Sequence, residues 1–308
     1  MANALRIIFM GTPEFAVPSL ELLIQNKKNI VAVITSEDKP QGRGQKLISS
    51  PVKEVALRNG IAVLQPSKLK DPEFIEHLKS FKADLQIVVA FRMLPEVIWA
   101  MPSRGTFNLH ASLLPQYRGA APINWAIING EKETGATTFF LKQEIDTGEI
   151  IFQNKEAINE MDDAGSLYDR LKIKGAELVL KTVNAIETGT VNSYKQATAL
   201  DLKIAPKIFK ETCRVNWATP AEQVKNFVRG LSPYPSAWTE IGKRNFKIFK
   251  VELGSLDDKT ESGSVRIIDK SLEVKCEDRW LIISELQQEG KKRMVTQEYL
   301  RGNELNLS

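Results

Sequence analysis

The sequence predicts an α/β protein with two domains: an open, mostly parallel, Rossmann-like sheet with helices on both faces, followed by a small β-barrel. The length of 308 residues suggests two domains at roughly 150 residues each. In the first half, apolar runs typical of buried strands alternate with amphipathic helical segments, whereas the last hundred residues carry several short β-rich runs. With 43% hydrophobic and 26% charged residues, the composition is that of a globular protein.

Each strand of the first domain is expected to be followed by a turn and a helix. After the first strand, Gly11-Thr12-Pro13 forms a turn and Leu20, Leu22 and Leu23 supply an apolar helix face. Ser50-Pro51 and Asp71-Pro72 mark two further helix starts, because proline is favoured in the first helical turn. The expected strands are 5–10, 30–35, 61–64, 85–90 and 107–110, with a helix over 122–128 after the last.

The pattern changes after Gly135. Two β runs, 136–141 and 149–153, flank the turn Asp146-Thr147-Gly148, and a long helix is expected from 164 to 186. Mixed polarity and Pro206 place an interdomain connection over 191–211, which gives domains 1–190 and 212–308. The β runs of the second domain predict an OB-like barrel and cover 237–241, 246–251, 264–268, 272–276 and 280–285.

The charge distribution distinguishes the two halves. The net charge is +4, and the whole excess of basic residues lies from Val191 onward. This pattern fits either a solvated surface or a face that attracts a polyanion. Cys213 and Cys276 lie in no metal-binding pattern, so we expect plain thiols. No segment reads as a signal peptide or membrane span, so we expect a cytoplasmic protein.

Familiar catalytic motifs are missing from the sequence. It contains no GxxxxGK[ST], no GxGxxG after the first strand, no GxSxG and no HExxH, which removes the usual support for kinases, dehydrogenases, α/β-hydrolases and zincins. Asp146-Thr147-Gly148 is also the aspartic-protease tripeptide, but a protease of this length would need two copies. The glycines of 41–46 follow the second strand and indicate a flexible basic loop.

The two histidines differ in setting. His77 lies within an amphipathic helix and reads as a surface residue, whereas His110 lies where an apolar strand meets a loop. In open α/β sheets ligands bind outside the carboxyl ends of the strands. Asn108 precedes His110 by two residues, so both side chains point to the same side of the strand. The residues alone leave open whether the pair acts on a ligand or only satisfies local backbone groups.

Several motifs resemble the formyltransferase domain that uses 10-formyltetrahydrofolate. They run from about Arg6 to the C-terminus, and those at 42–44, 207–208, 214–217 and 232–238 are similar to the formyltransferases that act on methionyl-tRNA. The motifs are GTPEFA at 11–16, GRG at 42–44, the Asn108-x-His110 pair, SLLP at 112–115, YRGAAPI at 117–123, DTG at 146–148, RVNW at 214–217 and SPYPSAW at 232–238. Ala111, Ile145 and Ser232 depart from the family pattern without removing a charge or a donor from the site.

The resemblance implies a site and its partners. Asn108, His110 and Asp146 would form the catalytic set, without a metal, and Ser112, Leu113, Leu114 and Pro115 would line the folate site. Methionyl initiator tRNA would be the acceptor, and the basic residues expected to contact it are Arg43, Lys46, Lys207, Lys243 and Arg244. We expect a monomer.

Two other functions remain open from the sequence. A formyltransferase with the same catalytic set could act on a small amine, such as an amino sugar nucleotide or glycinamide ribonucleotide. A basic second domain argues against this, because a small acceptor does not need one. A non-catalytic folate- or RNA-binding protein is the other alternative, and the presence of Asn108, His110 and Asp146 together argues against it.

Overall fold

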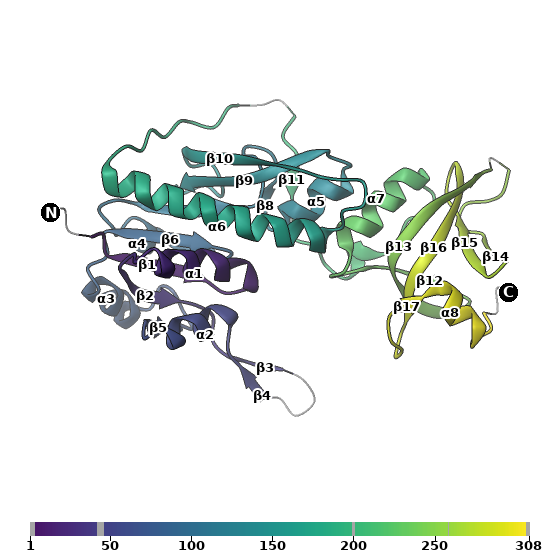
Figure 1. Ribbon diagram of the computed structural model, residues 1–308, viewed down its shortest axis with the longest axis horizontal. Helices are drawn as coiled ribbons and strands as arrows, with labels where there is room; N and C mark the ends of the chain where they lie inside the picture. Colours follow the sequence, from purple (N-terminus) through teal and green to yellow (C-terminus); the bar gives the residue numbers. More distant parts are fainter. Residues whose placement is uncertain (1–3, 42–45, 199–200, 258, 306–308) are drawn as a thin grey trace. The chain divides into compact units, whose positions relative to one another are not determined.

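The computed structural model describes residues 4–41, 46–198, 201–257 and 259–305 (Figure 1). The chain divides into two compact units. Unit 1 contains Met1–Arg118, Gly135–Glu156 and Asp169–Lys203, and unit 2 contains Gly119–Thr134, Ala157–Tyr168 and Ile204–Ser308. None of the described helices combines the length and apolar character that crossing a membrane requires.

Unit 1 is built on a seven-stranded sheet in which β1 (Ile7–Gly11) lies beside the central strand, β6 (Leu85–Val89). β1 pairs in parallel with β2 (Ile30–Ile34) and with β6, and every residue of β1 and β6 is buried. Such continuous apolar strands are typical of a parallel sheet covered on both faces. The sheet continues through β5 (Ala62–Leu64) on one side, and through β7 (Thr106–His110), β9 (Glu133–Phe140) and β10 (Ile150–Ala157) on the other.

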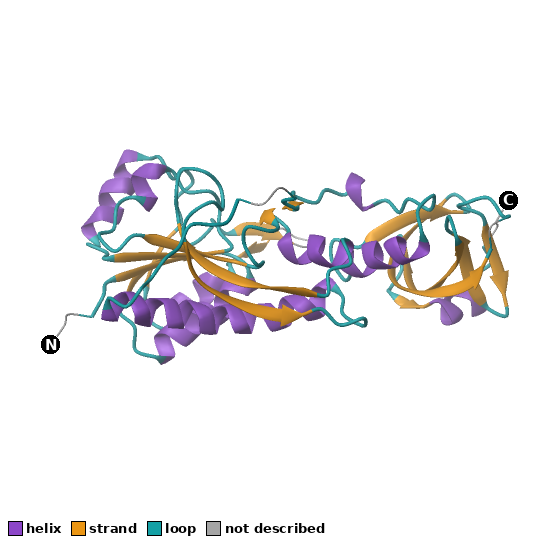
Figure 2. Ribbon diagram, turned by 90° about the horizontal axis from the view of Figure 1, so that it is seen from above, coloured by secondary structure: helices purple, strands orange, loops and turns teal. Residues whose placement is uncertain are grey.

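Helices cover both faces of this sheet (Figure 2). Ser50 and Asp71 cap two of them, because their side chains accept hydrogen bonds from the amides of Lys53 and Glu73 at 3.1 Å each. One face is buried by a cluster that includes Ile8, Met10 and Leu78. The helices of this part are η1 (Glu14–Ala16), α1 (Val17–Gln25), α2 (Pro51–Arg58), α3 (Pro72–Ser80), α4 (Glu96–Trp99) and α6 (Ala164–Thr188). The predicted Rossmann-like sheet is therefore confirmed.

A hairpin flanks the glycine-rich segment that the sequence indicated as a loop. β3 (Lys39–Gln41) pairs antiparallel with β4 (Lys46–Ile48), so Gln41 lies opposite Lys46. Each strand has only three residues and no clear alternation, which explains why the sequence pattern missed them.

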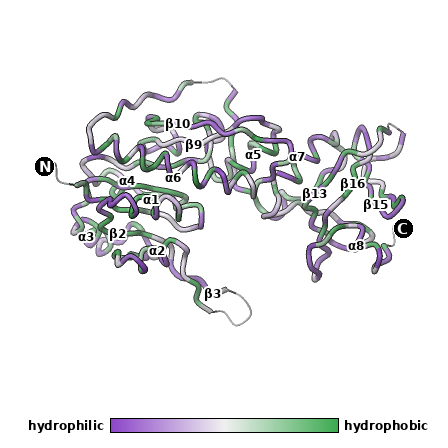
Figure 3. The backbone as a smooth tube through the Cα atoms, in the orientation of Figure 1, coloured by the Kyte–Doolittle hydropathy of each residue, from purple (hydrophilic) through white to green (hydrophobic). Residues whose placement is uncertain are grey.

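Unit 2 contains a six-stranded antiparallel sheet in the order β12-β13-β16-β15-β14, with β17 paired to β16. The sheet is strongly curved (Figure 2). In its core the rings of Phe246 and Tyr299 meet edge to face, with 5.6 Å between their centroids. Polar and apolar residues alternate along β13 (Figure 3), as expected where only one face of a strand is buried. The strands are β12 (Ala237–Ile241), β13 (Arg244–Leu256), β14 (Val265–Ile268), β15 (Ser271–Lys275), β16 (Arg279–Gln288) and β17 (Met294–Val295).

Two segments that precede the C-terminal sequence belong to unit 2. α5 (Pro122–Ile128) packs on α7 (Ala221–Leu231), where Asn124 donates a 2.8 Å hydrogen bond to the carbonyl of Gly230. A Cβ on Gly230 would lie 2.6 Å from Ile128, so glycine permits the close approach of the helices. Arg229 donates to the carbonyls of 159, 160 and 162. The remaining elements are β8 (Arg118–Gly119), β11 (Ile204–Ala205), η2 (Glu211–Cys213) and α8 (Thr296–Arg301).

Candidate active site

His110 is the last residue of β7 and is 6% exposed. Its Nε2 lies 2.8 Å from the carbonyl oxygen of Tyr117, which can only accept, so Nε2 carries a proton. Nδ1 therefore faces the other way, and it lies 3.9 Å from Oδ2 of Asp146. This separation is longer than a hydrogen bond, so the two groups face each other without a direct bond between these atoms.

Asn108 lies on the same strand, two residues before His110, and is partly buried. β7 is held between β6 and β9, with Asn108 opposite Val88 and Phe139. Period-two alternation directs Asn108 and His110 to the same side of the sheet. The strand thus supplies an amide and an imidazole from a rigid part of the fold.

Asp146 lies in the turn between β9 and β10, in a left-handed conformation with φ of 54°. Aspartate adopts this region more readily than most residues. Two residues later, a Cβ on Gly148 would overlap the carbonyl oxygen of Phe140, so only glycine fits there. The DTG sequence therefore has a structural reason as well as a chemical one: glycine lets the turn lie directly on β9.

The loop after β7 is fastened by its own polar groups. Ser112 is fully buried and donates a 2.6 Å hydrogen bond to the carbonyl of Gln116. Thr137 donates to the carbonyl of Ser112 and accepts from the amide of Leu114, whose side chain packs against Phe139. Leu113 and Pro115 are only partly buried. Of the four predicted folate residues, these two thus have exposed side-chain surface, whereas the side chains of Ser112 and Leu114 are buried.

The predicted tRNA contacts lie in different parts of the chain. Arg43 lies outside the described residues. The backbone of Lys46 opens β4 in unit 1. In unit 2, Lys207, Lys243 and Arg244 are all exposed, and Arg244 donates to the carbonyl of Glu304 at 3.1 Å.

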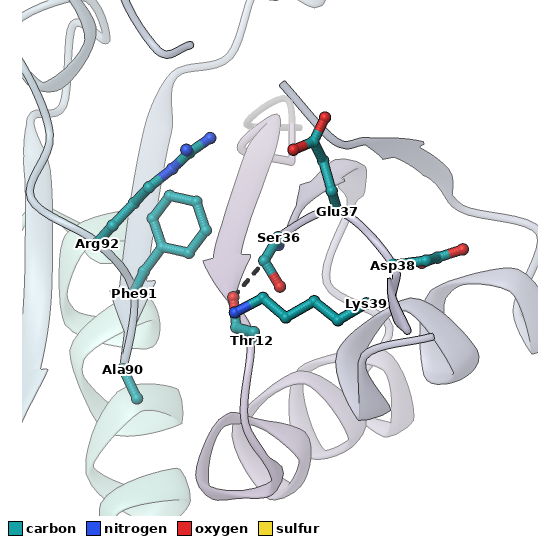
Figure 4. A pocket seen from close by; sticks show the side chains of 8 residues that line it. All are labelled: Thr12, Ser36, Glu37, Asp38, Lys39, Ala90, Phe91 and Arg92. Atoms are coloured by element: carbon teal, nitrogen blue, oxygen red, sulfur yellow. Dashed lines mark hydrogen bonds between the residues drawn. The ribbon is translucent and has the colours of Figure 1, made fainter. Parts of the chain in front are cut away.

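A cavity of about 390 Å³ lies at the carboxyl ends of β1, β2 and β6, and the sequence did not predict it (Figure 4). Phe91 and Arg92 line one side of it and Lys39 reaches in from the other, while the amide of Ser36 donates to the hydroxyl of Thr12 at 3.3 Å. The strand order reverses between β1 and β6, which is where ligands bind in such sheets. Polar residues that follow β1 and β2, such as Thr12 and Ser36, are the sequence signal for this cavity.

Around His110, the groups that can exchange protons are the imidazole of His110 itself and the carboxylate of Asp146. Among the described residues, no three His, Cys, Asp or Glu side chains gather in a way that could hold a metal ion. The arrangement can donate hydrogen bonds to a developing negative charge and can move a proton.

Comparison with known proteins identifies the family. Residues 5–183 match the formyl transferase family model, and residues 207–304 match the model of the formyl transferase C-terminal domain. The methionyl-tRNA formyltransferase of Bacteroides fragilis is 54% identical, and the alignment covers 97% of this chain and 95% of that protein. The methionyl-tRNA formyltransferase of Flavobacterium johnsoniae is 49% identical, with 97% and 96% covered.

Solved structures agree on the fold. The N-formyltransferase of Helicobacter canadensis, in complex with folinic acid and dTDP-3-aminofucose, aligns with a TM-score of 0.66 at 24% identity over 92% of this chain and 99% of that chain. HypX of Aquifex aeolicus, in complex with tetrahydrofolic acid, aligns with a TM-score of 0.65 at 18% identity over 97% of this chain and 47% of that one. Taken with the near full-length sequence matches, both family models place this chain in the methionyl-tRNA formyltransferase family.

Proposed function

We propose that this protein transfers the formyl group of 10-formyltetrahydrofolate to the α-amino group of methionyl initiator tRNA. The observation that carries this proposal is the match to methionyl-tRNA formyltransferases along both domains, with 52% and 54% of the aligned residues identical in two of them. The exposed basic residues of unit 2, including Lys207, Lys243 and Arg244, support a polyanionic acceptor.

The reaction needs a neutral amine and stabilisation of an oxyanion. The lone pair of the α-amino nitrogen attacks the formyl carbon, and the carbonyl π electrons move to oxygen. When the tetrahedral intermediate collapses, the bond between the formyl carbon and folate N10 breaks, N10 takes up a proton, and the amine loses one. Asn108 and His110 are the proposed donors to the oxyanion.

The hydrogen bond from His110 Nε2 to Tyr117 determines which ring nitrogen is used. Because Nε2 is committed to the backbone, Nδ1 is the nitrogen that meets substrate and Asp146. Nδ1 can donate to the oxyanion only when it carries a proton as well, and Asp146 is proposed to accept a proton from the amine, directly or through water. Leu113 and Pro115 are proposed to contact the folate through their side chains, and Ser112 and Leu114 through their backbone.

We also infer a cytoplasmic monomer with a catalytic domain over 1–190, a basic linker over 191–211 and a tRNA-binding domain over 212–308. The separate family matches at 5–183 and 207–304 support a boundary in this region of the chain. Light scattering at several protein concentrations tests the monomer, and a dimer at micromolar concentration would contradict it.

The purified protein should be incubated with 10-formyltetrahydrofolate and methionyl initiator tRNA, and separately with an amino sugar nucleotide and glycinamide ribonucleotide. Formylmethionyl-tRNA is the expected product. His110→Ala and Asp146→Ala should abolish turnover, and Asn108→Ala should lower kcat by about 10²- to 10³-fold, the usual cost of one oxyanion donor.

His77→Ala is the matched control, because His77 lies on α3 and stacks on Phe81, 5.3 Å between ring centroids. This variant should keep wild-type kcat. Preferential formylation of a small amine would replace the proposed acceptor, and near-normal turnover by His110→Ala would refute the catalytic assignment.

A further inference from the structure

The segment that follows α6 lies against the turn that carries Asp146. We call residues 193–198 the strap. Tyr194 forms two backbone hydrogen bonds with Ile150, of 2.8 and 3.0 Å, and the hydroxyl of Ser193 donates to Glu149 at 2.8 Å. This hydroxyl is also the main reason why the pKa of Glu149 is lowered. The strap thus pairs with the first residue of β10 through a single antiparallel β-bridge.

Gln196 of the strap is the residue that reaches the turn itself. Its Nε2 donates to the carbonyl of Asp146 at 2.7 Å and to the carbonyl of Gly148 at 2.9 Å. Its Oε1 accepts from Nη2 of Arg118 at 2.6 Å and from Nε at 3.2 Å. Since a guanidinium has no acceptor, Arg118 fixes the orientation of this amide and points both of its N–H groups at the turn.

The turn has a physical need for such a support. Asp146 holds a left-handed conformation that costs about 1–3 kcal/mol where nothing compensates for it. The neighbouring Glu144 and Ile145 are exposed, so their side chains give the turn no core packing. The hydrogen bonds from the Arg118 guanidinium to Gln196 Oε1 involve a charged donor and are stronger than neutral ones. They polarise the amide of Gln196, which strengthens the two bonds that Nε2 donates to the turn.

Arg118 connects the same bridge to the histidine. It follows Tyr117, whose carbonyl accepts the hydrogen bond from His110 Nε2. One end of the bridge is therefore covalently attached to the group that orients His110, and the other end holds the backbone of Asp146. Between these two ends, Nδ1 of His110 lies 3.9 Å from Oδ2 of Asp146.

We propose that Arg118 and Gln196 are positioning residues that set the geometry between His110 and Asp146. They do not touch the reacting atoms. The proposal rests on the proposed function, because it assigns them a role in the same reaction. A misplacement of about 1 Å in a reacting group can lower a rate by about 10²-fold, so loss of the bridge should act on kcat.

The test is a set of variants measured by initial rates of formylation with saturating donor and acceptor. Gln196→Leu keeps the size of the side chain and removes all four hydrogen bonds. Arg118→Met removes the charged donor and leaves the amide. We expect Gln196→Leu to lower kcat by about 10- to 10²-fold with KM for both substrates within threefold of wild type.

The control is Ser193→Ala, which removes a hydrogen bond of the same strap and leaves both contacts of Gln196 with the turn. It should keep wild-type kcat. A double-mutant cycle then separates positioning from general stability. The double variant Arg118→Met/Gln196→Leu should be no slower than the slower single variant, because both changes break one bridge.

Gln196→Leu should also have little further effect in an Asp146→Asn background, where the group that it positions is already disabled. Multiplicative losses in this background, or wild-type kcat in Gln196→Leu, would overturn the proposal. A wild-type protein that forms no formylmethionyl-tRNA would instead overturn the proposed function. If a small amine proves to be the acceptor, the same cycle is measured with that amine.

Discussion

Gly148 offers a direct test of how the Asp146 turn is built. In Gly148→Ala, the new Cβ would overlap the carbonyl oxygen of Phe140 and approach Cδ2 of Phe139 to 3.2 Å. Phe139 is fully buried, and both phenylalanines pair with β7, opposite Asn108 and Phe107. Because β9 is fixed between its neighbours, the turn must move by roughly 1 Å, and a shift of this size can lower a rate by ~10²-fold.

We expect kcat for formylmethionyl-tRNA formation to fall by about 10²-fold, equivalent to ~2.7 kcal/mol in the activation free energy. The thermal unfolding midpoint should fall by only a few degrees, since overpacking typically costs about 1–3 kcal/mol.

The control is Gly189→Ala at the end of α6, where φ is 68° and no atom lies within 4 Å of the new Cβ. It should cost about 1–2 kcal/mol in stability for a left-handed alanine, without loss of kcat. A Gly148→Ala enzyme with kcat within twofold of wild type would refute the reasoning.

Three further predictions concern stability, thiol chemistry and tRNA. Asp278 accepts a 2.8 Å hydrogen bond from the amide of Ala221 at the start of α7, and this contact is the main reason why its pKa is lowered. A lowered folded-state pKa stabilises the protein above the unfolded pKa of about 4 and loses this effect as the pH falls below it. Asp278→Ala should therefore cost about 1 kcal/mol at pH 7, a typical value for a lost cap, and less at pH 3. Burial raises the pKa of Cys276 to about 12 and also raises that of Cys213, so iodoacetamide at pH 8 should label neither thiol until the protein is unfolded, as followed by mass spectrometry. Arg43→Ala should lower kcat/KM for methionyl-tRNA and reduce its salt dependence by about one phosphate contact, with KM for the formyl donor unchanged.

Each of these has a result that would contradict it. Equal destabilisation by Asp278→Ala at pH 7 and pH 3, measured by urea unfolding, would mean that the carboxylate charge does not matter. Rapid labelling of either cysteine in the native protein would show that burial does not protect it. Arg58→Ala, which removes an exposed arginine from α2, is the control for Arg43. An equal loss in both variants would point to net charge and not to a specific contact.

The candidate site was predicted in part. His110 and Asn108 followed from strand periodicity and the position of the strand end, while Asp146 and the folate loop followed from the family resemblance. Spacing along the chain gave no means of finding Gln196, because it lies 50 residues from Asp146 in a segment without periodicity. That segment was interpreted as a connection between domains, although its first residues belong to unit 1 and Gln196 donates hydrogen bonds to the turn that carries Asp146.

The sequence by itself determined the alternation of the longer strands and helices, the edge of the sheet expected to carry the site, and the family. These features depend on local patterns of apolar residues, on proline and glycine at turns, and on short motifs, all of which are visible along the chain. Only the tertiary structure decided which nitrogen of His110 faces Asp146, and how Arg118 and Gln196 connect the loop after β7 to the turn of Asp146. It also decided that α5 packs with α7. These depend on contacts between residues far apart in the sequence, whose geometry is set by packing of the whole unit and leaves no periodic signal.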